Sequence, residues 1–237
     1  MLVPLTRQTF EELIPAVATG AQYKYAWGKP SDFLKRLLIS VVIVLLLILV
    51  YKLAWEDGGQ VVLILGLVAG LYWLWGPVLS ASLRNIQCRK YKYSGFWQGR
   101  VLDVYITEDV ITQEETVNKK GELVIVDNLE RMINVEVGDK TGFTTQLKAP
   151  INRSHQEIVP GQVALMIVMS NEEDLSRIAK ASDIYIPSRN IWVSDYPYLR
   201  RDVFIEVSNQ LKRKRGKKGV DGGEERRSER MRSRVDY

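Results

Sequence analysis

The sequence predicts an α+β membrane protein with a two-helix transmembrane hairpin, a small, mostly β, barrel-like soluble domain, a C-terminal helix and a disordered basic tail. Three observations predict this class. Residues 37–51 and 58–83 are apolar runs without a charge. Residues 95–192 contain short stretches of strand-like alternation. Residues 212–237 hold many bases and almost no apolar side chain. The predicted segments are 1–33, 34–83, 84–211 and 212–237.

The composition excludes several classes of protein. The 237 residues include one Cys and one His, so a disulfide-stapled fold and the usual zinc sites, which need several such ligands, are excluded. The formal charge is +5, but residues 212–237 alone hold 11 Lys or Arg and 5 Asp or Glu. The rest of the chain carries a net charge of −1 and gives no electrostatic argument for nucleic-acid binding.

Residues 1–33 are expected to form an interfacial segment at the membrane surface. Thr9 and Glu12 fit a capping box at the start of a short helix. Aromatic and basic residues then mix between Tyr23 and Lys29, which suits the headgroup region. An irregular leader packed on the soluble domain is the alternative. A cleaved signal peptide is not expected, because the first apolar run starts near residue 37.

Residues 34–83 are predicted to cross the membrane twice. The first run, with its apolar flanks, reaches about 20 residues, the length of a membrane span. The connector Glu56–Gly59 allows only a tight hairpin, so the two helices should be antiparallel neighbours. Lys and Arg are concentrated before the first span and after the second, which places both termini on the cytoplasmic or stromal side.

Two glycines in the second run indicate a helix-packing face. Gly66 and Gly70 have the spacing that lets two backbones approach closely in a membrane. Two partners stay open, the protein's own first span and a foreign helix. Gly76 and Pro77 should kink or end the straight part of this span. Neither span holds a buried acid, base or histidine, so a transporter made of these helices alone is not expected.

Residues 84–211 are predicted to form a β-rich domain with a closing helix. Short strands separated by turns favour a small closed barrel, with an open sheet and a helix as the alternative. A helix start is expected at Asn171–Asp174. The closing helix is expected over Tyr196–Leu211 with Asp195 as its cap. The expected strands are Arg100–Ile111, Glu122–Val126, Arg131–Val137, Phe143–Leu147, Gln162–Met169, Asp183–Pro187 and Asn190–Val193.

The sequence holds no constellation typical of catalysis. His155 stands alone in a polar stretch and is expected at the surface. Cys88 follows the second span among basic residues, where a thiol can be acylated or lose its proton more readily; an ordinary juxtamembrane cysteine is the preferred interpretation. Nucleotide-binding and serine-nucleophile motifs are missing. We therefore expect a protein that is not an enzyme, with no catalytic, cofactor-binding or metal-binding residue and no small-molecule substrate.

The tail, residues 212–237, is predicted to be disordered because it is charged and poor in apolar residues. Its candidate targets are anionic lipid, RNA such as that of a ribosome, and an acidic protein face. A merely solvating tail is the alternative. The expected electrostatic contacts are Lys212, Arg213, Lys214, Arg215, Lys217, Lys218, Arg226 and Arg227.

Four stretches resemble a family of small two-span membrane proteins of cyanobacteria and plastids. They are LVPLTRQTFEELIPAVATG, YKYAWGKPSDFLKRLLISVV, SGFWQGRVLDV and SDIYIPSRNIWVSDYPYLRRDVF. The resemblance covers residues 1–211 and excludes the tail. Members are sometimes labelled phosphate permease-like, a label that spans without polar groups do not support. The resemblance implies a thylakoid protein that acts in photosystem assembly, and it assigns no functional residues.

Two functions follow as hypotheses. In the first, a non-enzymatic thylakoid protein docks its hairpin beside another integral membrane protein or photosystem subunit, and its soluble domain holds a partner. In the second, the protein is a subunit or regulator of a membrane transport complex of the ABC type. Membrane lipid is a partner in both.

Overall fold

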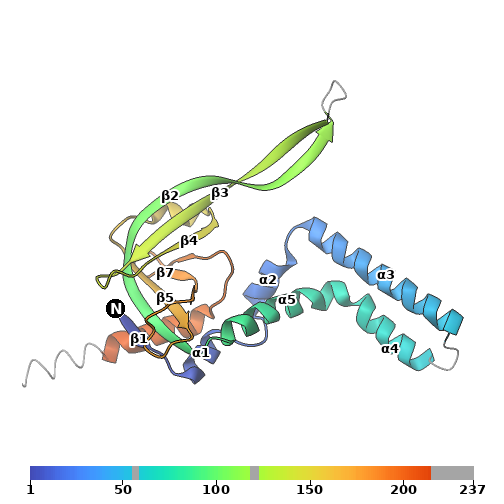
Figure 1. Ribbon diagram of the computed structural model, residues 1–237, viewed down its shortest axis with the longest axis horizontal. Coiled ribbons are helices and arrows are strands. Elements are labelled where there is room, and N and C mark those ends of the chain that lie inside the picture. The colour runs from blue at the N-terminus through green and yellow to red at the C-terminus, as the bar shows by residue number, and fades with distance from the viewer. Residues whose placement is uncertain (55–58, 118–122, 215–237) are drawn as a thin grey trace, which may run out of the picture. The chain divides into compact units, whose positions relative to one another are not determined.

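The computed structural model describes residues 1–54, 59–117 and 123–214 (Figure 1). The chain divides into two compact units, Met1–Tyr198 and Leu199–Tyr237. The first unit holds the N-terminal helices and the β-sheet. The described part of the second unit is built on one helix, residues 201–214.

The N-terminal segment is folded and begins with a strand. β1 (Leu2–Pro4) pairs antiparallel with β2 (Tyr93–Val117). The following α1 (Arg7–Leu13) buries Phe10 and Leu13. Residues 2–13 are therefore regular structure packed in the first unit, not an irregular leader.

The cap of α1 differs from the prediction. Thr6 caps the helix, and its hydroxyl accepts a hydrogen bond from the Thr9 amide at 3.3 Å. The capping box predicted at Thr9 and Glu12 is wrong by one turn, because another threonine stands three residues earlier. The helix ends at Ile14 because the next residue is Pro15, and a residue that precedes a proline disfavours the helical conformation.

A second short helix, α2 (Gly20–Trp27), forms in the stretch of mixed aromatic and basic residues, where no helix was predicted. Thr19 and Gln22 form the reciprocal capping box at its start. The Gln22 side chain accepts from the Thr19 amide at 2.9 Å, and the Thr19 hydroxyl accepts from the Gln22 amide at 3.4 Å. The helix ends at Gly28, whose φ of 68° is readily adopted by glycine.

Three apolar helices follow, α3 (Pro30–Ala54), α4 (Gly59–Gly70) and α5 (Tyr72–Arg89). α3 is long and apolar enough to cross a membrane, and the bent pair of α4 and α5 makes a second crossing if it counts as one span. A Cβ built on Gly59 lies 3.5 Å from the Tyr51 hydroxyl, and one built on Gly70 lies 3.6 Å from Val44. α3 and α4 therefore pack side by side and antiparallel, as expected. Glu56, Asp57 and Gly58 of the predicted connector lie outside the described residues.

The second apolar run bends earlier than predicted. α4 and α5 meet at 67° at Leu71, whose φ of −92° and ψ of 8° leave the helical region. The Trp75 indole N–H donates to the Val68 carbonyl at 2.8 Å and satisfies an acceptor near the break. α5 continues through Pro77, so the break at Leu71, rather than Gly76 and Pro77, ends the straight part of the run.

All the strands of the sheet pair antiparallel, in the order β4-β3-β2-β5-β7-β8. β1 pairs with β2 and β6 pairs with β5 off this path. The strands after β2 are β3 (Leu123–Gly138), β4 (Thr144–Pro150), β5 (Val163–Ser170), β6 (Lys180–Ala181), β7 (Ile184–Ile186) and β8 (Ile191–Val193).

The sheet is open, so the predicted barrel is wrong and the alternative is correct. β4 and β8 are its two edges in the described residues. A barrel needs strands of matched length with a fixed stagger, whereas β2 has 25 residues and β8 has three. One core cluster lies on one face and contains Trp97, Val101, Ile133, Val135, Val137, Ala164, Met166, Val168, Ile184 and Val193. The opposite face of β5 also buries Leu165, Ile167 and Met169.

Two helix predictions after β5 are wrong: no helix starts at Asn171–Asp174, and the last helix starts later than predicted. Residues 171–179 form bends and turns, and Leu175 has a φ of 56°, which a right-handed helix does not allow. Leu175 is buried beside Gly95, where an added Cβ would lie 2.7 Å from its side chain. The last helix begins at 201 rather than at Tyr196, so Asp195 is not its cap.

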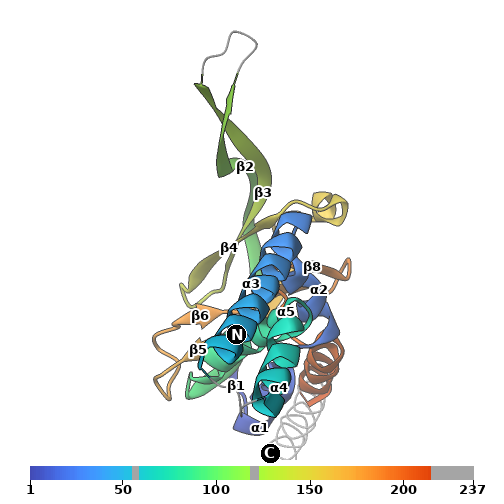
Figure 2. The same ribbon diagram turned by 90° about the vertical axis from the view of Figure 1, so that its right-hand side faces the viewer.

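β2 and β3 continue together beyond the end of β4 as a two-stranded ribbon, the arm (Figures 1 and 2). β4 pairs with β3 only from Met132 to Gly138, and β5 pairs with β2 only from Tyr93 to Arg100. A bulge near Ile111 shifts the register within the arm, and another near Leu102 shifts it in the sheet, before the arm begins. The predicted strands Arg100–Ile111 and Arg131–Val137, and Glu122–Val126 from Leu123 onward, are therefore parts of these two longer strands.

Candidate functional site

The apolar helices α3 and α4 expose most of their large side chains. Only 6% of the apolar window of α3 is buried. Leu45 is 60% exposed and Leu63 is 69% exposed, although both lie inside charge-free runs. The core helix of a soluble protein is buried, so this exposure favours lipid or a protein partner as the natural surroundings.

The two predicted packing glycines lie in different surroundings. Gly70 is beside Val44 of α3, whereas a Cβ on Gly66 meets no atom within 4 Å. Gly70 therefore serves contact with the protein's own first apolar helix. Gly66 is the glycine that leaves room for a foreign helix.

Aromatic rings gather where α2, α3 and α5 meet. Trp27 stacks on Phe33 at 5.7 Å, and Trp73 meets Phe33 edge to face at 5.8 Å between ring centroids. Arg36 lies 5.8 Å from the Trp27 ring centroid and donates to the Ala26 carbonyl at 3.1 Å. Such a group of aromatic rings around an arginine is typical of a membrane interface.

A buried amide pair joins the helices to the chain after the sheet. Gln22 of α2 and Asn85 of α5 are both fully buried. Their side chains exchange two hydrogen bonds, at 3.1 Å and 2.8 Å. Gln22 also donates to the carbonyls of Pro197 and Tyr198 at 2.9 Å and 3.1 Å. The Thr19–Gln22 capping pattern in the sequence indicates the helix that carries Gln22, but it was not among the predictions.

Lys180 lies next to this junction and holds a second set of contacts. Its ammonium donates to the Tyr198 hydroxyl at 2.8 Å and to the Cys88 sulfur at 3.4 Å. Burial lowers the pKa of Lys180, but the Tyr198 hydrogen bond and the nearby Cys88 outweigh it and raise the pKa. Lys180 therefore stays charged and is not a nucleophile. Cys88 is fully buried, so the folded protein shields it from acylation.

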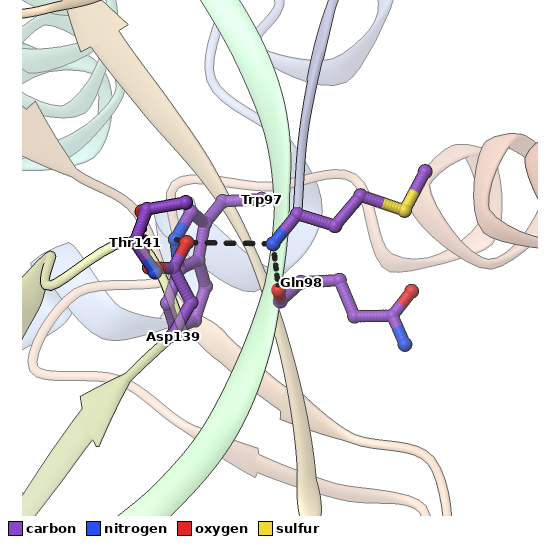
Figure 3. Close-up of polar contacts among 5 residues, drawn as sticks. Trp97, Gln98, Asp139 and Thr141 are labelled. Atoms are coloured by element: carbon purple, nitrogen blue, oxygen red, sulfur yellow. Dashed lines mark hydrogen bonds and ion pairs between the residues drawn. The ribbon is translucent and has the colours of Figure 1, made fainter.

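Asp139 organises the turn after β3 (Figure 3). It accepts from the Trp97 indole at 3.0 Å, from the Thr141 amide at 2.9 Å and from the Met1 ammonium at 3.3 Å. Met1 also donates to the Gln98 carbonyl at 2.7 Å. Burial raises the pKa of Asp139, but the hydrogen bonds from Thr141 and the ammonium outweigh it and lower the pKa.

His155 is buried, not at the surface as predicted. Its ring accepts from the Asn152 amide at 3.2 Å, and Nε2 lies 3.2 Å from the Trp192 carbonyl. This pattern fits a neutral ring with its proton on Nε2. Burial lowers the pKa of His155, and the hydrogen bond to Trp192 only partly opposes this. The residue links the 3₁₀ helix η2 (Arg153–Glu157) to β8 and has a structural role.

One face of the arm carries exposed apolar side chains that nothing in the described residues covers. Side chains alternate along a strand, so Leu123, Ile125 and Leu129 share the face of the buried Ile133. They are 75%, 62% and 54% exposed. Val110 lies opposite Leu129 and is 49% exposed. The same face also carries Arg131, which pairs with Glu108, and Asp127, which accepts from Gln113, so charged and polar side chains interrupt the apolar ones.

The predicted tail contacts fall into two groups. Lys212, Arg213 and Lys214 form the exposed end of the helix 201–214, where basic residues complement the helix dipole. Arg215, Lys217, Lys218, Arg226 and Arg227 lie outside the described residues. In the part of the chain that the structure describes, no group of three or more His, Cys, Asp or Glu side chains is arranged to hold a metal ion.

Comparison with known proteins gives one match. The model of a family of unknown function, DUF8619, matches residues 3–215. This span includes the apolar helices, the whole sheet and the helix 201–214. No curated protein and no solved structure matches the chain.

Proposed function

We propose that this chain, which belongs to the family of unknown function DUF8619, is a non-enzymatic integral membrane protein that binds a partner complex. The apolar helices would anchor it, and the sheet domain with its arm would hold the partner on the cytoplasmic or stromal side. The resemblance to cyanobacterial and plastid proteins favours the thylakoid as the membrane. It also favours assembly of a photosynthetic complex as the task.

One observation carries the anchoring part of this proposal. The side chains of α3 are apolar around the whole helix and remain exposed in the fold, as shown by Leu38 at 64% and Leu46 at 55%. Each apolar side chain moved from water into lipid contributes about 1.5–3 kcal/mol. A helix with more than ten such residues has a strong preference for the bilayer.

The arm supports the partner-binding part. A two-stranded hairpin is marginally stable alone in water, and this one exposes Leu123, Ile125 and Leu129. The two stretches 105–117 and 123–131 hold six acidic residues and one basic residue. Two copies of the arm would therefore repel each other. The partner that fits is a protein surface with apolar side chains flanked by Lys or Arg.

Purification of the tagged full chain from mildly solubilised thylakoid membranes tests the proposal. We expect subunits of a photosystem or of its assembly intermediates to co-purify in fixed proportion. Recovery of ATPase or permease subunits instead would support the transport-complex hypothesis and contradict ours.

A matched pair of variants tests the role of the arm. Leu129→Glu places a charge on the exposed apolar face, and we expect at least tenfold less partner in the purified sample. Asn128→Glu adds the same charge on the opposite face one residue away, and the partner should be retained. Equal recovery with both variants would exclude the apolar face as the binding surface.

A further inference from the structure

A small cavity lies where the apolar helices end. Its volume is about 180 Å³, and it is lined by Tyr25 and Ala26 of α2, Ser80, Ala81 and Arg84 of α5, and Tyr196. Pockets for drug-sized ligands measure about 300–1,000 Å³. This cavity therefore suits one small polar group rather than a whole metabolite.

The cavity presents one positive charge and three hydroxyl groups. Two of these hydroxyls already donate inside the protein, Ser80 to the Pro77 carbonyl at 3.0 Å and Tyr196 to the Ala81 carbonyl at 3.4 Å. The Arg84 guanidinium lies 5.1 Å from the ring centroid of Tyr196 and interacts with the hydroxyl of Tyr25. Ser80 is one turn before Arg84 and lines the same cavity. A guanidinium held beside hydroxyl donors binds oxyanions such as phosphate in charge-assisted hydrogen bonds.

Both phenols keep their protons at neutral pH. Burial raises the pKa of Tyr196 to about 12. Burial also raises the pKa of Tyr25, and the nearby Asp195 carboxylate adds to this rise. The Tyr25 hydroxyl therefore remains a donor to an anion, whereas the Tyr196 hydroxyl donates to the Ala81 carbonyl. Asp195 is itself exposed, and solvent screens its repulsion of a bound anion.

Arg84 differs from the next arginine on the same helix. Arg89 pairs with Glu11 at 2.5 Å. In the described residues, the ion pairs that the fold forms do not include Arg84. The charge of Arg89 is thus compensated inside the protein, whereas that of Arg84 is available to a ligand.

The position along the chain points to the source of that ligand. Arg84 is the first charged residue after the uncharged run 58–83, and Tyr25 lies in α2, just before α3 begins at Pro30. If α3 and α5 leave the bilayer here, the cavity lies at the level of the headgroups. This step rests on the membrane anchoring proposed above. We propose that the cavity binds the phosphate of an anionic lipid headgroup, held by Arg84 and Tyr25.

Lipid binding to the purified full chain in neutral detergent tests this inference independently of any partner complex. The probe is short-chain phosphatidylglycerol, with phosphatidylcholine as the zwitterionic control, and the readouts are native mass spectrometry and the melting temperature. We expect phosphatidylglycerol to bind at one site and to raise the melting temperature. Arg84→Gln should weaken this binding at least tenfold, and Arg89→Gln should leave it unchanged.

Further arms separate the two sources of phosphate and guard against misfolding. Tyr25→Phe removes one hydroxyl without a charge and should weaken lipid binding about threefold, the loss expected for one modest hydrogen bond. Inorganic phosphate that reproduces the full, Arg84-dependent stabilisation would assign the cavity to the free anion and overturn the lipid assignment. Equal phosphatidylglycerol binding by the wild type, Arg84→Gln and Tyr25→Phe would overturn the site itself.

Discussion

The buried amide pair gives a prediction whose size follows from its hydrogen bonds. Asn85→Ala removes the two bonds to Gln22, at 2.8 Å and 3.1 Å, while Gln22 keeps its bonds to the carbonyls of Pro197 and Tyr198. At about 0.5–1.5 kcal/mol for each bond, the loss is about 2 kcal/mol. Gln22→Ala removes those bonds as well and leaves Asn85 buried without its partner, so about 4 kcal/mol is expected.

The two substitutions should not add. Once Gln22 is gone, Asn85 has lost its bonds to that side chain, and removing Asn85 as well also removes its buried polar atoms. We expect the double variant to resemble Gln22→Ala, with a coupling energy of about 2 kcal/mol in magnitude.

Melting temperatures of the full chain in detergent measure these differences. A loss of about 2 kcal/mol corresponds to a fall of roughly 4–8 °C for a chain of this size. Gln87→Ala, an exposed site on the same helix, is the control and should melt like the wild type. Equal melting of Asn85→Ala and Gln87→Ala, or full additivity in the double variant, would refute the reasoning.

Three further predictions concern single positions. Gly70→Leu should lower the melting temperature because the new side chain meets Val44 of α3, whereas Gly66→Leu should leave it unchanged; the opposite order would contradict the assigned faces. The pKa of Asp139 is lowered in the folded protein. Its contribution to stability is therefore present above its unfolded pKa of about 3.9 and is lost as the pH falls through the folded value. Asp139→Asn should make the free energy of unfolding depend less on pH below pH ~4. The pKa of His155 is lowered in the folded protein, so its contribution to stability is complete above pH ~6.5 and is lost as the pH falls below that value. Denaturant unfolding should show a lower free energy of unfolding at pH 5 than at pH 7 in the wild type, and this difference should be smaller in His155→Gln.

The sequence was most informative about the apolar helices, because the length of an uncharged run is a local property. It predicted two antiparallel apolar runs. The first is α3, whereas the second is divided into α4 and α5 and continues past the predicted end at residue 83 to Arg89. The bend at Leu71 was missed, since Gly76 and Pro77 are the obvious local disruptors. The bend instead coincides with a Trp75 bond to Val68, a contact that residue types alone do not reveal.

The open sheet and the arm depend on pairing between distant residues. The polar stretch around Asn128 resembles a turn, yet it continues β3 because β2 pairs with it along the whole ribbon. Closure into a barrel or an open sheet is decided by strand lengths and edges, which no local pattern encodes. The same holds for Gln22 and Asn85. They are buried because α2 and α5, which are far apart in the sequence, pack together in the fold.

Cysteine labelling in membrane vesicles tests the central claim most directly. In a Cys88→Ala background, Leu45→Cys on α3 and Leu123→Cys on the arm place a thiol at sites that are 60% and 75% exposed in the fold. The account predicts that a membrane-impermeant maleimide labels Leu123→Cys in vesicles with the cytoplasmic or stromal face outward, and that Leu45→Cys reacts only after denaturation in SDS. Labelling of both thiols at the same rate in intact vesicles would show that α3 lies in water and would contradict the account.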